Sequence, residues 1–184
     1  MPDGRRLNLK GDTMSSGLIT FTLVHVVISL IGILSGLVVA GGLVSGKRLE
    51  GWTGLFLVTT AATSISGFGF PFEKFLPSHA VAIVSLVVLP VVIVARYLKH
   101  LAGPWRGIYT VGAVLALYLN FFVLIAQLFL RVPALIAAAP TGKEPPFAIT
   151  QLIALALFVW LGFAAVRGFR AASSATPGAA AQHT

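Results

Sequence analysis

The stretch from Tyr118 to Gln151 reads YLNFFVLIAQLFLRVPALIAAAPTGKEPPFAITQ, and it decides how the rest of the chain is interpreted. It begins inside an apolar segment that carries two amides, Asn120 and Gln127, passes through a loop bracketed by prolines, and enters a second apolar segment at Gln151. Apolar runs of roughly 18 or more residues without charges indicate transmembrane helices. The stretch therefore predicts two membrane helices whose polar side chains gather toward the end where the loop joins them.

The composition of the whole chain extends this prediction. Of its 184 residues, 57% are hydrophobic and 10% are charged, and the mean hydropathy is +0.95. A soluble domain carries about 25% charged residues. The 13 Lys and Arg residues that give the net charge of +8 are scattered in ones and twos at segment ends, which argues against a nucleic-acid partner and for the lipid bilayer. The absence of cysteine excludes disulfides, thiolate metal sites and iron–sulfur clusters.

We predict an all-α integral membrane bundle that occupies residues 17–170. A polar N-terminal tail (1–16) precedes it, and a disordered C-terminal tail (171–184) follows it. The five expected transmembrane helices cover about 18–44, 52–70, 78–98, 107–130 and 148–168. The segment 52–70 is the least apolar, so the count falls to four if it does not span. In the first helix Gly32, Gly36 and Ala40 form a ridge of small residues that predicts the close approach of another helix.

Five spans place the two ends of the chain on opposite faces of the membrane. The first face holds six Lys and Arg residues and the second holds seven, or three against seven if translation starts at Met14. Because cytoplasmic loops carry an excess of cations, we predict an external N-terminus and a cytoplasmic C-terminus.

The segment from Pro140 to Pro146 lacks the glycine spacing of a phosphate loop. It predicts a stiff turn, with Glu144 favourable near a helix N-terminus.

Polar side chains from several spans fall near the first face. Asn120 and Gln127 share one helical face with Ala113 and Ala116, and that face should point into the bundle, since amides facing lipid would lack partners. The alternating direction of the spans brings further polar groups to the same end. The candidate ligand-binding pocket consists of His25, Glu73, His79, Asn120, Gln127 and Gln151.

Three uses of this pocket compete. Its polar groups could bond one another and fix the helix register, or they could bind a small ligand or ion in a transport or accessory protein. The third use is haem b, held between the imidazoles of His25 and His79; otherwise no cofactor and no metal site is predicted. No His-x-x-x-His or paired-carboxylate set is present, and no carboxylate lies inside a span, so we predict a non-catalytic protein.

The segments Tyr118–Gln127 (YLNFFVLIAQ) and Ala139–Phe147 (APTGKEPPF), followed by Gln151, resemble a family of small, uncharacterised, multi-pass bacterial membrane proteins. The resemblance covers the last three spans. The family carries no assigned activity, so the resemblance implies a bacterial inner membrane location and supplies no catalytic residues. Beyond the bilayer, the expected partners are a small ligand or other membrane subunits.

Overall fold

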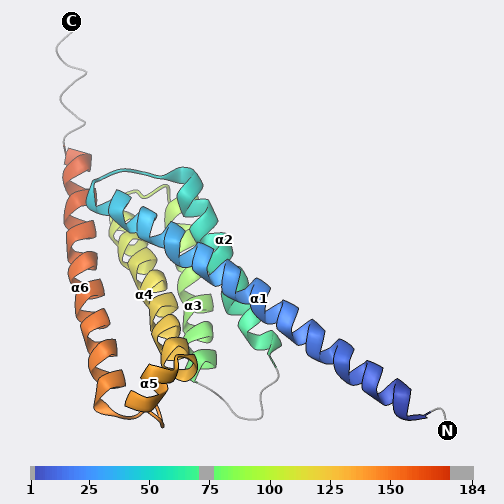
Figure 1. Ribbon diagram of the computed structural model, residues 1–184. Helices are drawn as coiled ribbons and strands as arrows, with labels where there is room; N and C mark the ends of the chain where they lie inside the picture. Colours follow the sequence, from blue (N-terminus) through green and yellow to red (C-terminus); the bar gives the residue numbers. More distant parts are fainter. Residues whose placement is uncertain (1–2, 71–76, 175–184) are drawn as a thin grey trace, which may run out of the picture.

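The computed structural model describes residues 3–70 and 77–174, with side chains described for 16–70 and 79–171 (Figure 1). The described part is helical and contains no strand. Its long helices are α1 (Asp3–Val44), α2 (Glu50–Ser66), α3 (Pro77–Ile93), α4 (Trp105–Arg131) and α6 (Pro145–Ser174). Three short elements accompany them: a 3-10 turn η1 (Gly67–Gly69), a π-helical turn η2 (Val94–Leu98) and the helix α5 (Pro133–Ala138).

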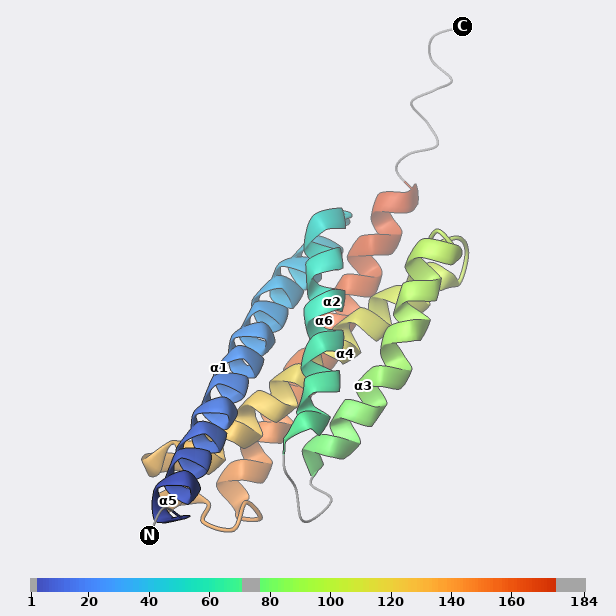
Figure 2. The same cartoon turned by 90° about the vertical axis from the view of Figure 1, so that its right-hand side faces the viewer.

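Successive long helices run in alternating directions, so that the start of α1 and the end of α6 lie at opposite ends of the bundle (Figure 2). Helix α4 packs against α1, α3 and α6, and α1 also packs against α2 and α6. Helix α2 closes the arrangement by packing against α3. The turn from α1 to α2, the turn from α3 to α4 and the end of α6 therefore share one end of the bundle, which we call the C-terminal end (Figures 1 and 2).

The predicted ridge of small residues on α1 is confirmed. A Cβ atom added at Gly36 would lie 2.6 Å from Leu117 Cδ1 and 2.8 Å from Phe56 Cε2, and one added at Gly32 would lie 3.2 Å from Thr59 Oγ1. These glycines let α1 approach α2 and α4 closely, as small residues do between membrane helices. The core beside them is apolar, with Phe56 and Leu117 almost completely buried.

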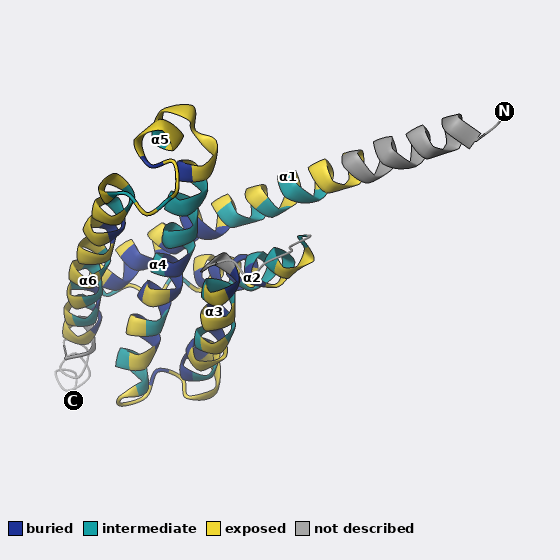
Figure 3. Ribbon diagram, turned by 90° about the horizontal axis from the view of Figure 1, so that it is seen from below, coloured by how far each residue is buried: buried dark blue, intermediate teal, exposed yellow. Residues whose placement is uncertain are grey.

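The outer surface of the bundle is apolar. Large side chains such as Trp160 and Phe163 on α6 are 68% and 66% exposed, and Figure 3 shows exposed residues along most of that helix. Four segments of the described residues are long and apolar enough to cross a membrane: Ser16–Val44, His79–Leu98, Trp105–Arg131 and Pro145–Ala171. Apolar surface of this extent is normal against lipid and exceptional in water. The part of the chain that the structure describes is therefore an all-helical membrane bundle.

The structure changes three details of the predicted organisation. Helix α1 continues back to Asp3 through the expected polar tail, because extending a formed helix costs far less than nucleating one. The connection between the last two predicted spans (131–147) contains α5, which begins at Pro133, a residue suited to the first helical position. Helix α6 extends to Ser174, and the remainder of the expected disordered tail (175–184) lies outside the described residues.

Candidate functional site

His25, a half-buried residue of the predicted pocket on α1, is bonded to α2. Its Nδ1 lies 2.8 Å from Ser66 Oγ, and the Ser66 hydroxyl donates to the carbonyl oxygen of Thr63 at 3.2 Å. The direction of the bond between His25 and Ser66 depends on the tautomer of the imidazole. The His25 ring also meets the edge of Phe70, with 5.0 Å between the ring centroids. These contacts fix the rotation of α1 against α2.

Two of the three amides in the predicted pocket, Asn120 and Gln151, bond to a neighbouring helix. Asn120 Nδ2 donates to Thr60 Oγ1 at 3.0 Å, which links α4 to a fully buried hydroxyl on α2. Gln151 Nε2 donates to the carbonyl oxygen of Phe122 at 3.1 Å, which links α6 to α4. The expectation that Asn120 faces the bundle interior is confirmed.

The remaining predicted residues lie apart from these contacts. Gln127 accepts a bond from Nε of Arg131 at 3.2 Å, within α4 and at an exposed position. His79 is buried and lies beside Phe68, with 5.8 Å between the ring centroids, so both histidines border the short segment after α2. Glu73 lies outside the described residues. The ligand pocket at this end, and its haem variant, stay predictions.

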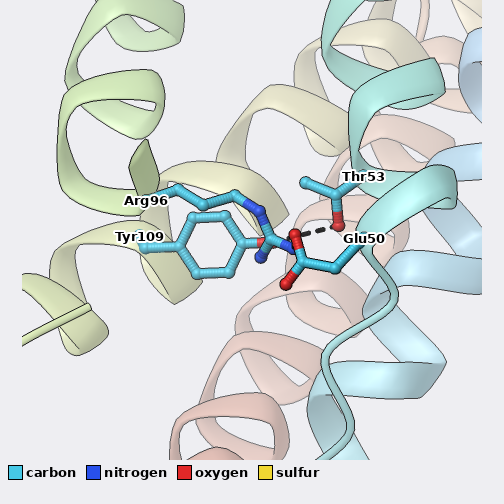
Figure 4. Close-up of polar contacts among 4 residues, drawn as sticks. All are labelled: Glu50, Thr53, Arg96 and Tyr109. Atoms are coloured by element: carbon cyan, nitrogen blue, oxygen red, sulfur yellow. Dashed lines mark hydrogen bonds and ion pairs between the residues drawn. The ribbon is translucent and has the colours of Figure 1, made fainter. Parts of the chain in front are cut away.

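A second polar cluster, which the sequence patterns did not predict, lies at the C-terminal end of the bundle (Figure 4). Arg96, in the π-helical turn after α3, is only 5% exposed. Its Nη2 lies 2.7 Å from Glu50 Oε2 at the start of α2, and its Nη1 donates to the Tyr109 hydroxyl on α4 at 3.0 Å. Thr53 Oγ1 lies 3.4 Å from the same hydroxyl. The cluster joins three helices around one guanidinium.

The surroundings of Arg96 stabilise its positive charge but leave part of its hydrogen-bonding capacity unused. Its Cζ atom lies 5.1 Å from the ring centroid of Tyr109 and 5.7 Å from that of Tyr97, within the range of cation–π attraction. Nε is buried and has no hydrogen-bond partner, and Nη2 is close to Glu50 without being aligned for a hydrogen bond. Buried donors without partners are rare in proteins and often mark the place of an ion or water.

An open cavity of about 200 Å³ lies against this cluster. It is lined by Arg48, Glu50, Arg96, Tyr97, His100 and Leu101. His100 and Leu101 both adopt positive φ angles, 49° and 58°, which residues with a side chain rarely do and which occur preferentially at functional sites. With two arginines against one glutamate, the cavity wall carries a formal excess of positive charge even when His100 is neutral.

The sequence does contain a signal for this cluster. Arg96 and Glu50 fall on the same predicted face of the membrane, and Glu50 is one of only five acidic residues. By its position in the sequence alone, Arg96 is an interfacial cation that helps to set orientation. Hydropathy cannot show that a cation near a helix end turns inward, because that depends on how the neighbouring helices are rotated.

Taken together, the fold and this charged cavity define a multi-pass helical membrane protein with a cationic recess at one end of its bundle. Comparison of the chain with family models, with curated proteins and with solved structures gives no match. The functional assignment therefore rests on the geometry of the chain itself.

Proposed function

We propose that the protein crosses the membrane five times, with α2 as the second crossing. The 17 residues of α2 span about 25 Å at ~1.5 Å per residue. The three residues of η1 add about 6 Å at ~2 Å per residue. The sum matches a hydrocarbon core of about 30 Å. Trp52, near the start of α2, is 48% exposed, as befits an aromatic residue at the headgroup level.

We further propose that the C-terminal end of the bundle faces the cytoplasm and that the N-terminus is external. The C-terminal end carries more Lys and Arg residues than the opposite face once the chain is counted from Met14. The excess of cations on cytoplasmic loops supports this orientation. In a bacterium, the family resemblance of the last three spans would place the protein in the inner membrane.

The role we propose is non-catalytic: the protein binds a small ligand or serves as an accessory subunit of another membrane protein. His25 and Asn120, in the outer half of the bundle, make bonds between helices, which supports a structural use for them. The cavity beside Arg96 differs, because it combines open volume, charge and unused donors. The burial of Arg96 with Nε unpartnered is the single observation that carries the proposal.

Native mass spectrometry of protein extracted in a mild detergent tests this role for a ligand of any chemical class. We expect a small-molecule adduct on the wild-type chain that is lost in Arg96→Met. Arg131→Met is the matched control, because Arg131 is an exposed arginine on α4 that bonds to Gln127 on its own helix. An adduct that persists in Arg96→Met, or the absence of any adduct from the wild-type protein, would contradict the proposal.

A further inference from the structure

We infer that the cavity at the C-terminal end binds a phosphate group, which displaces the Glu50 carboxylate from Arg96. The inference rests on the proposed binding role and names the chemistry of the ligand. Guanidinium groups form paired hydrogen bonds with phosphate oxygens. The wall of the cavity supplies two such groups, Arg48 and Arg96.

Arg96 is already held in place for this task. Its side chain is 3% exposed, and its Nη1 is fixed by the Tyr109 hydroxyl at 3.0 Å. Ordering a flexible arginine costs conformational entropy when a ligand binds, and that cost is removed where packing fixes the side chain beforehand. Nη2, which lies beside Glu50 without a hydrogen bond, is the donor that an incoming anion takes over.

Glu50 acts as an internal substitute for the anion. Its side chain is 70% exposed, whereas that of its partner Arg96 is 3% exposed. A solvated carboxylate is free to swing into water, while the buried guanidinium stays in place. A ligand phosphate therefore competes with Glu50 for the Nη2 edge, and the departure of Glu50 leaves the cavity with two arginines and no carboxylate in its wall.

The start of α2 adds a third attractive element. Glu50 is the first residue of this helix, and the preceding Leu49 provides no side-chain cap. The first backbone N–H groups of a helix lack partners within it and carry partial positive charge, which favours a bound anion. Arg48 and Glu50 both line the cavity, so this helix terminus lies at its rim.

The position of the cavity is compatible with two sources of phosphate. Tyr97 in its wall is 43% exposed, and aromatic residues of this kind sit at the level of lipid headgroups. Basic pockets between membrane helices on the cytoplasmic side bind anionic lipid headgroups. The same cavity is open rather than enclosed, so it also admits a soluble phosphate. The two sources share one chemistry, and the experiment separates them.

The test titrates the detergent-purified protein with inorganic phosphate and, separately, with a short-chain phosphatidylglycerol against a short-chain phosphatidylcholine added to the same micelles. We expect Arg96→Gln to weaken the affinity at least tenfold and Glu50→Gln to strengthen it severalfold, since the amide keeps the size of the side chain and removes the competing charge. Arg131→Gln should leave the affinity unchanged, because Arg131 is outside the cavity.

The outcomes divide cleanly. Saturable binding of inorganic phosphate supports a soluble source, and binding of phosphatidylglycerol in preference to phosphatidylcholine, without binding of inorganic phosphate, supports a headgroup. Absence of both, or a Glu50→Gln variant that binds equally or more weakly, overturns the inference, and the latter result does not depend on the folding of any Arg96 variant. An Arg96-dependent adduct that contains no phosphorus would overturn the phosphate assignment while leaving the proposed binding role intact.

Discussion

The contact between the ends of α1 and α6 makes a sharp prediction about Gly168. A Cβ atom added there would overlap the carbonyl group of Val44 and would come within 3.1 Å of the carbonyl oxygen of Leu43. These are backbone atoms that cannot rotate away as a side chain does. Gly168→Ala should therefore force α6 away from the end of α1, from which the turn carrying Arg48 begins.

The expected cost follows from this geometry. Overpacking a well-packed contact costs about 1–3 kcal/mol, and a backbone obstacle places Gly168→Ala at or above the upper end of that range. The helix propensity of alanine returns up to about 1 kcal/mol. A net loss of about 2 kcal/mol corresponds to a fall in Tm of roughly 4–8 °C for a chain of this size.

Thermal unfolding of the detergent-purified variant, followed by circular dichroism, measures this effect. Gly162→Ala is the matched control on the same helix, because a Cβ there meets only Val114 Cγ1 at an ordinary 3.9 Å. We expect the control to equal or slightly exceed the wild type in Tm. A Gly168→Ala protein whose Tm matches that of Gly162→Ala would refute the argument from close helix approach.

Three further predictions concern the other polar contacts. Asn120→Ala removes the bond to Thr60 and should lower the stability by about 0.6–1.7 kcal/mol, measured by unfolding in mixed micelles. Partial desolvation acts to raise the pKa of Glu144, but hydrogen bonds from the hydroxyl and backbone N–H of Thr141 and from the backbone N–H of Lys143 lower this pKa below its ordinary value. The stabilisation from this loop contact is therefore fully present at pH values above the ordinary glutamate pKa, and it is lost as the pH falls through the lowered pKa of Glu144. Thr141→Ala removes one of the hydrogen bonds and should raise the titration midpoint of Glu144 in a carbon-13 NMR titration. The proposed role predicts no Soret band in protein from haem-replete cells, whereas a band that is lost in His25→Ala would establish the haem alternative.

The four longest apolar segments could be predicted from sequence because each is a long apolar run ended by charges, glycine or proline. The ridge at Gly32 and Gly36 could also be predicted, since helical spacing places both on one face and membrane helices approach each other there. The inward direction of Asn120 follows from the cost of an amide facing lipid. These features depend on local spacing or on a single strong energetic rule.

The features that escaped prediction depend on how far neighbouring helices reach and how they are rotated. Gln127 shares the helical face of Asn120, yet it bonds to Arg131 within α4 and not to a neighbouring helix. The spacing of residues along α4 does not show how far a neighbouring helix extends over that face. Sequence position alone gives Arg96 the same interfacial place as Lys99. Only the π-helical turn and the approach of α2 carry Arg96 into the bundle beside Glu50.

The central claim is that α2 crosses the membrane and so brings the two turns of the cationic cavity to one face. The chain has no cysteine, which allows single cysteines at the exposed positions Ser45 and Ala102 to be labelled with a membrane-impermeant maleimide. We expect both to react only from the cytoplasmic side, and a cysteine at the exposed Ala138 to react only from the opposite side. Labelling of Ser45→Cys and Ala102→Cys from opposite sides of the membrane would show that α2 does not cross and would contradict the account.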